Sequence, residues 1–224
     1  MRSQSLPRAI AISFLITIVA GIIAQMFISQ RLGTAAEIAA NPGLFSLGFT
    51  IYLVEMAAQI TMTVLFYQLL KPVHQGAALL STVFGLVGCT IKTLARLFYI
   101  VPLVVVQGHS FSGDQVNSLV LLLLTIDDRG AALALPFFGL STVIQGWLIV
   151  RSTYLPRWLG TLTIVGGAGW LAFLWPPLGY AAFPFIALLA LVGSVAMIYW
   201  FLVRGIADAP NTRWGVPTYP SVRA

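Results

Sequence analysis

The sequence predicts an all-α, polytopic integral membrane protein: a six-transmembrane-helix bundle with one short outer-side interfacial helix. Three observations carry this prediction. Of the 224 residues, 59% are hydrophobic and 8% are charged, whereas a soluble domain needs roughly 25% charged residues to cover its surface. Six segments contain the run of about 20 apolar residues that a helix needs to cross a bilayer. Most basic residues lie at the ends of these segments, as membrane topology requires.

The predicted spans follow one another in a single domain, residues 1–207. The first span, 9–28, follows Arg2 and Arg8 as a signal peptide would, but its apolar run is too long and further spans come after it. We therefore expect an uncleaved helix. Residues 208–224 contain several prolines and are expected to form a disordered cytoplasmic tail. The remaining predicted spans are 45–70, 77–106, 129–150, 158–174 and 183–203.

An apolar stretch, residues 118–126, lies between the third and fourth spans and is too short to cross the hydrocarbon. Asp114 and Asn117 precede it, and Asp127 follows it. We predict a short helix that lies on the outer membrane surface or enters it as a re-entrant segment. A seventh span here would move the C-terminus to the other side.

The orientation follows from the basic residues outside the spans, because cytoplasmic loops carry an excess of Lys and Arg. Two of them, Arg31 and Arg129, lie on one side. Eight lie on the other side, which is therefore the cytoplasmic one. An even number of spans places both termini on that side, and we expect a bacterial cytoplasmic (inner) membrane. The eight are Arg2, Arg8, Lys71, Arg151, Arg157, Arg204, Arg213 and Arg223.

Charged residues inside the spans can be matched by depth. Glu55 precedes Leu70, and Lys92 follows Gly76, by nearly the same stretch of chain, a little over four helical turns in each case. At 1.5 Å per residue, both lie about 23 Å from the turn that joins the second and third spans. The sequence therefore predicts a Glu55–Lys92 ion pair between antiparallel neighbours.

A second pair is predicted one turn further out, between Arg96 and either Asp127 or Asp128. Polar and aromatic neighbours at helical spacing can extend the network. The candidate site therefore comprises Glu55, Lys92, Arg96, Asp127, Asp128, Tyr52, Gln59 and Tyr99.

Two interpretations of these charges stay open. They can be structural ion pairs that specify which helices pack together, since breaking a buried pair costs about 3–5 kcal/mol. They can also line an outward-opening pocket for an anion, a proton path or a polar head group, because intramembrane ionisable residues mark functional sites. A surplus cation would favour an anionic ligand.

These interpretations lead to two functions. The first is binding or transport of a small or amphipathic ligand in a charge-lined pocket of the outer half, which predicts a cavity that reaches Glu55, Lys92 and Arg96. The second is a non-catalytic accessory subunit that packs against another membrane protein or a pigment assembly, which predicts a dry interior.

No catalytic or cofactor motif is present in the sequence. It contains no nucleotide-binding loop, zinc-protease motif or serine-hydrolase motif, so we expect no enzyme activity. His74 and His109, the two histidines, are expected in loops on opposite sides of the membrane, so they are not expected to bind one metal or haem together. The single cysteine, Cys89, is expected to be a buried structural thiol. The lipid bilayer is the expected partner, and nucleic acid is not, because the basic residues form no soluble patch.

Two stretches resemble one family. TAAEIAANPGLFSLGF (34–49) with LFYQLLKPVHQ (65–75) is similar to that family's outer loop and second helix, and FFGLSTVIQGWLIVRSTYLPRWLG (137–160) to its fourth helix and following turn. The family is a bacterial membrane family known as domain of unknown function 4386. The resemblance covers nearly the whole chain and implies a multi-spanning helical protein, but no activity.

The sequence also departs from that family's pattern. Typical members have an acid where Tyr52 stands and a Glu where Ser194 stands. Here the acid is Glu55, with Lys92 and Arg96 added. The charge network is therefore expected to be particular to this protein.

Overall fold

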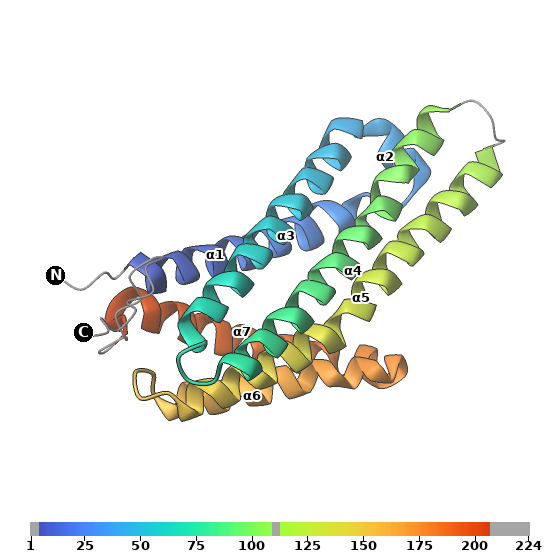
Figure 1. The fold of residues 1–224 in the computed structure, drawn as a ribbon. Coiled ribbons are helices and arrows are strands. Elements are labelled where there is room, and N and C mark those ends of the chain that lie inside the picture. Colours follow the sequence, from blue (N-terminus) through green and yellow to red (C-terminus); the bar gives the residue numbers. More distant parts are fainter. Residues whose placement is uncertain (1–4, 109–112, 207–224) are drawn as a thin grey trace, which may run out of the picture.

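The computed structural model describes residues 5–108 and 113–206, and every element that these residues form is helical (Figure 1). The predicted all-α class is confirmed. Residues 208–224 and His109 lie outside the described residues. The α-helices are α1 (Ser5–Ile22), α2 (Ala35–Ala40), α3 (Pro42–Leu70), α4 (Gln75–Gln107), α5 (Gly113–Arg151), α6 (Arg157–Trp170) and α7 (Pro176–Tyr199). Four shorter helices continue or join them: η1 (Ile23–Ile28), η2 (Ser29–Arg31), η3 (Leu171–Leu174) and η4 (Trp200–Arg204).

Local signals explain where several helices begin. Thr34 and Glu37 form a capping box at the start of α2, and these hydrogen bonds lower the pKa of Glu37 below its usual value. The side chain of His74 caps α4 by accepting a hydrogen bond from the Ala77 amide at 3.1 Å. Pro42 occupies the first position of α3, where its missing N–H has no partner to lose.

Five helices of the described residues are long and apolar enough to cross a membrane. They are Ser5–Arg31, Pro42–Leu70, Gln75–Gln107, Gly113–Arg151 and Pro176–Arg204. The span predicted at 158–174 corresponds to α6 and η3. With 14 residues, α6 alone is about 21 Å long and does not reach across a hydrocarbon layer of about 30 Å.

The prediction of a separate short helix at 118–126 is wrong, because α5 runs without a break from Gly113 to Arg151. The acids that follow the stretch suggested that the chain leaves the membrane there. Instead, Arg96 neutralises Asp127 inside the bundle, so the helix can continue through it. With 39 residues α5 is about 58 Å long, well beyond the hydrocarbon thickness.

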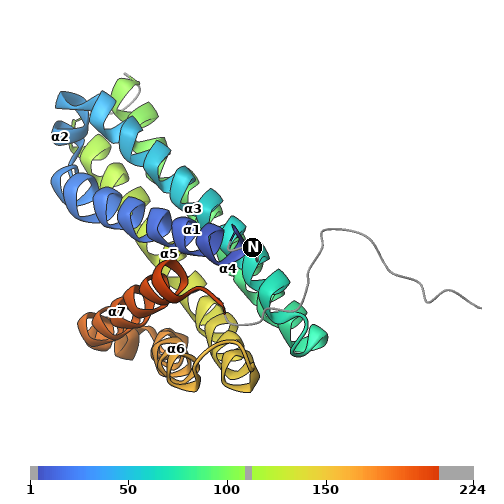
Figure 2. The same cartoon turned by 90° about the vertical axis from the view of Figure 1, so that its left-hand side faces the viewer.

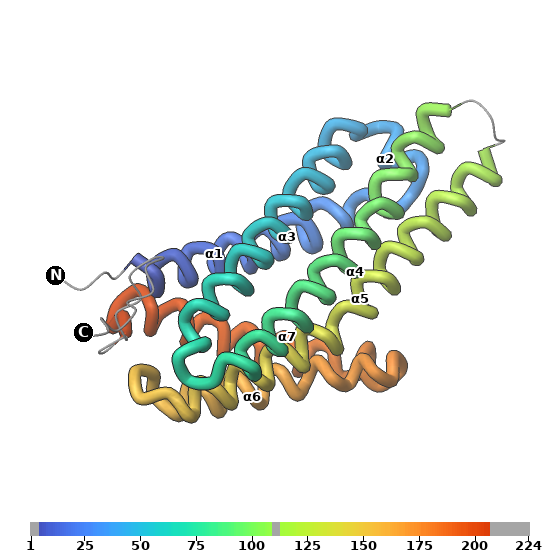
Figure 3. The backbone as a smooth tube through the Cα atoms, in the orientation of Figure 1, coloured from blue at the N-terminus to red at the C-terminus, as the bar shows by residue number. Residues whose placement is uncertain are grey.

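The helices close a ring. Each of α1, α3, α4, α5, α6 and α7 packs on the next, and α7 packs back on α1. Figure 2 shows α6 and α7 together below α1 and α3. The backbone trace in Figure 3 places the turn at 71–74 and the loop at 152–156 at the same end as the start of α1 and the end of η4.

Two apolar clusters fill the two ends of this ring. The one near the 71–74 turn contains Phe66, Leu148 and Phe201. The one at the opposite end contains Phe45, Tyr99 and Val120.

Candidate functional site

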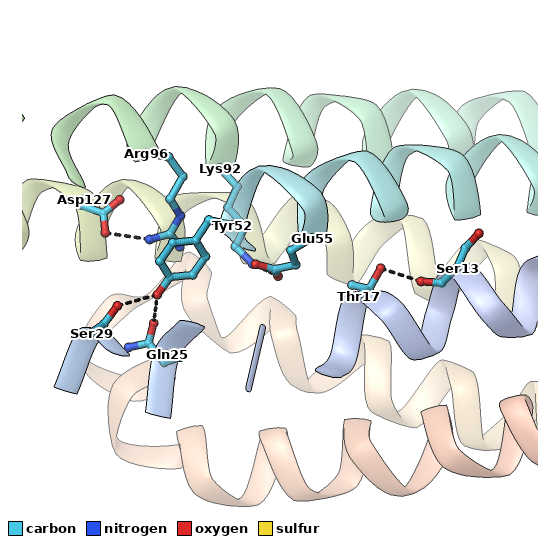
Figure 4. Close-up of polar contacts among 9 residues, drawn as sticks. All are labelled: Ser13, Thr17, Gln25, Ser29, Tyr52, Glu55, Lys92, Arg96 and Asp127. Carbon is cyan, nitrogen blue, oxygen red and sulfur yellow. Dashed lines mark hydrogen bonds and ion pairs between the residues drawn. The ribbon is translucent and has the colours of Figure 1, made fainter. Parts of the chain in front are cut away.

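The first ion pair joins α3 to α4. Lys92 Nζ donates a hydrogen bond to Glu55 Oε1 at 2.5 Å, which is the pairing predicted from depth (Figure 4). The Glu55 side chain is 7% exposed and that of Lys92 20%. Gly21 of α1 covers the carboxylate so closely that a Cβ there would lie 3.3 Å from Oε1. The pair is therefore enclosed by three helices.

The second ion pair joins α4 to α5. Arg96 Nη1 donates to Asp127 Oδ2 at 2.7 Å, and both side chains are less than one tenth exposed. The guanidinium also lies over the ring of Tyr52, with Cζ 3.7 Å from the centroid, a cation–π contact (Figure 4). Of the two acids that the sequence left open, Asp127 is the partner of Arg96.

Tyr52 links this pair to the first helix. Its hydroxyl donates to Gln25 Oε1 at 2.8 Å and lies 2.9 Å from Ser29 Oγ. Gln25 belongs to the π-helical turn η1, and Ser29 follows that turn. Tyr99 lies edge-on to Tyr52, with centroids 5.3 Å apart, and stacks on Phe45 at 4.5 Å. Arg96 thus packs on Tyr52, and the contacts of Tyr52 connect α3 to α4 and η1.

The network has no net charge, because two cations face two carboxylates. No surplus cation in it calls for an anionic ligand. Among the described residues, four buried side-chain atoms lack a hydrogen-bond partner: Glu55 Oε2, Arg96 Nε, Tyr99 Oη and Asp127 Oδ1. Each charge has one ionic partner, Arg96 also lies over the Tyr52 ring, and both ion pairs join neighbouring helices.

Two predicted site residues contact neither the ion pairs nor Tyr52. Asp128 is exposed and accepts a hydrogen bond from the Tyr180 hydroxyl at 3.3 Å, while Arg129 lies over the Tyr180 ring. Gln59, one turn from Glu55, lines a cavity instead.

This cavity, which we call the central cavity, has a volume of about 140 Å³. It lies inside the helix ring, and α1, α3, α4, α5, α6 and α7 all contribute to its wall. None of its lining residues is ionisable, and Glu55, Lys92 and Arg96 are not among them. Its polar side chains are Gln59, Thr63, Ser141, Thr142, Gln145, Thr163 and Ser194.

Depth places the central cavity nearer to the 71–74 turn than the ion pairs. Gln59 precedes Leu70, and Ser141 precedes Arg151, by about three helical turns in each case. Both are therefore about 15–17 Å from the end of the molecule at which α3 and α5 finish.

The sequence did not single out this cavity. Ser141 and Gln145 stand out as polar residues within a span, but hydrogen bonds between helices explain such residues equally well. Thr63, Thr163 and Ser194 give even less signal, because Ser and Thr in apolar helices commonly bond to their own backbone. Only their convergence in space distinguishes them.

Comparisons with known proteins place the chain among uncharacterised proteins. A family model described as "Domain of unknown function (DUF4386)" matches residues 9–205, which confirms the resemblance found in the sequence. A protein of Archaeoglobus fulgidus, described as an "Uncharacterized protein", is 26% identical over 150 residues, which are 65% of this chain and 76% of that protein. No solved structure matches the chain.

Proposed function

The chain belongs to the DUF4386 family, and on that premise we propose that it is a non-catalytic membrane protein that binds or transports a small or amphipathic ligand. The observation that carries this proposal is the central cavity, because an enclosed hollow between the helices of a bundle, lined by apolar side chains with a few converging polar groups, is the usual form of a small-molecule site. The ligand-binding site is therefore proposed in the cavity, one to two helical turns from the charged residues at which the sequence placed it.

In this proposal the ion pairs are structural. They join α3 to α4 and α4 to α5, and they carry no net charge. A transmembrane charge without a partner costs about 2.5–3.5 kcal/mol on insertion scales, so each pair favours one helix arrangement over its alternatives. The cavity then forms between helices whose register is set by the network.

We further propose six crossings of a bacterial cytoplasmic (inner) membrane, with both termini in the cytoplasm. Support comes from α6 and η3, which together fill the interval between α5 and α7 (Figure 3), and from the basic residues that flank the 71–74 and 152–156 connections. A single cysteine at His74, in a Cys89→Ser background, should react with a membrane-impermeant reagent only from the cytoplasmic side. Labelling from the outside would contradict this orientation and place the 71–74 turn on the outer side.

Native mass spectrometry of protein extracted gently from its own membrane tests the binding function. We expect a bound small mass in the wild type and in Lys92→Met, and its loss in Gly193→Leu. Gly193 lines the cavity, and a Cβ there would meet nothing closer than 3.6 Å, so a side chain can be attached at this position without a clash at its first atom. A mass that is lost in Lys92→Met but kept in Gly193→Leu would place the ligand at the charges.

An accessory-subunit function is the second candidate, favoured by the exposure of α7. Only 17% of its most apolar window is buried, against 28–39% in the other four candidate spans. Phe185, which is 77% exposed, lies on this helix, and Trp175, which is 68% exposed, immediately precedes it. In the same mass spectrometry experiment, a co-purifying protein without any small mass would favour this function over binding.

A further inference from the structure

We propose that the central cavity selects an uncharged molecule of about six non-hydrogen atoms that donates hydrogen bonds. This inference rests on the proposed binding function and adds the chemical class of the ligand. It follows from three features of the wall: its size, the use of its hydroxyl protons and its lack of charge.

The volume of about 140 Å³ sets the size of the ligand. A cavity of roughly 150 Å³ in a protein interior holds a benzene molecule. The central cavity therefore has room for a compact molecule of that size, or for the polar head of a longer amphiphile that reaches in from the lipid.

The hydroxyl protons of three lining residues are already used. Thr63 donates to the backbone carbonyl of Gln59, Thr163 to a carbonyl one turn earlier in α6, and Ser194 to that of Ala190, at 2.7–2.8 Å. A carbonyl oxygen can only accept, so each hydroxyl must be the donor. These three oxygens keep lone pairs but have no proton to offer a ligand.

Ser141 is committed in the same way. Ser81 donates its single proton to the Ser141 carbonyl at 2.9 Å, so in the contact between the two hydroxyls Ser141 must donate. Gln145 Nε2 also donates to the Ser141 hydroxyl at 3.3 Å. Four of the five hydroxyls in the wall are thus acceptors toward a ligand, while the amides of Gln59 and Gln145 can both donate and accept. A ligand with an O–H or N–H, whose heteroatom also accepts, is matched to both kinds of group.

The residues around these acceptors disfavour a charged ligand. No lining residue is ionisable, and the rest of the wall includes Phe14, Phe66, Phe138 and Met197. A charged ligand would be desolvated there without an ion pair, which is costly in a low-dielectric site. A neutral alcohol or amide loses only hydrogen bonds that the acceptors can replace.

Two isomers test the donor requirement. Cyclopentanol and tetrahydropyran share one molecular formula and six non-hydrogen atoms, but only cyclopentanol can donate a hydrogen bond. Binding to delipidated protein in detergent can be followed by NMR of ¹³C-methyl methionines, because Met62 and Met197 line the cavity. Met26, which is 56% exposed on η1, serves as the internal control for detergent effects.

We expect cyclopentanol to shift the Met62 and Met197 signals and to bind about two- to tenfold more tightly than tetrahydropyran, the ratio for one net hydrogen bond. Cyclopentylammonium, a cation of the same size, should bind more weakly than cyclopentanol. Gly193→Leu should abolish all three titrations.

The outcomes separate the two proposals. Equal or tighter binding of tetrahydropyran, or tighter binding of cyclopentylammonium, would overturn the ligand class while leaving a binding cavity in place. Titrations in which none of the three molecules moves Met62 or Met197 would overturn both the ligand class and the cavity as a binding site.

Discussion

Separating Arg96 from Asp127 should destabilise the protein more than any other change to the charge network. The two side chains are 5% and 9% exposed. Removing one partner leaves the other as a buried, unpaired charge, which typically costs about 3–5 kcal/mol. For a chain of this length that corresponds to a fall in melting temperature of roughly 6–20 °C. We expect this for both Arg96→Met and Asp127→Asn.

The double variant distinguishes a pair from two independent residues. Replacing a buried pair by neutral groups of similar volume is often nearly neutral, so the double variant should recover much of the loss. Thermal unfolding in detergent measures all three variants, and Asp128→Asn, at an exposed neighbour, should stay within about 0.5 kcal/mol of wild type. Additive losses in the double variant would refute direct interaction of Arg96 and Asp127.

Three further predictions follow from the same packing. Glu55→Gln and Lys92→Met should show the same non-additive pattern in thermal unfolding with smaller losses, because Lys92 is 20% exposed; additive losses would mean that this contact contributes nothing. Gly146→Ala should destabilise by about 1–3 kcal/mol, because its Cβ would lie 2.7 Å from a backbone oxygen of α6. Gly193→Ala, where the nearest atom is 3.6 Å away, should not; equal effects would contradict the close approach. Burial raises the pKa of Tyr154, in the loop before α6, to about 12. Since this exceeds its unfolded value of about 10, its contribution is present below pH 10 and lost as the pH rises through 12. Tyr154→Phe should cost about 0.5–1.5 kcal/mol at pH 7 and flatten that alkaline loss in pH-dependent unfolding.

The sequence predicted the parts of the structure that depend on one helix at a time. Apolar runs and helix-end residues locate the helices, and counting residues from a shared turn brings Glu55 to the level of Lys92. The rise per residue is constant, so depth can be calculated before any packing is known. The same calculation placed Arg96 near two acids but could not choose between them, because that choice depends on which face of α5 turns inward.

The parts that the sequence missed depend on several helices at once. Asp127 looked like the end of a membrane segment, because its partner lies on another helix. The central cavity draws its wall from six helices, and no spacing along one of them reveals it. In both cases the role of a polar residue depends on its contacts with other helices.

The most direct test of ligand binding in the central cavity is an experimental structure of the protein purified from its own membrane. We expect density for a compact molecule within hydrogen-bonding distance of the Thr63, Ser141 and Ser194 hydroxyls, and direct contact without intervening density between Lys92 and Glu55. A central cavity closed by its own side chains, with ligand density beside Lys92 instead, would contradict the assignment of binding to the cavity and of the charges to structure.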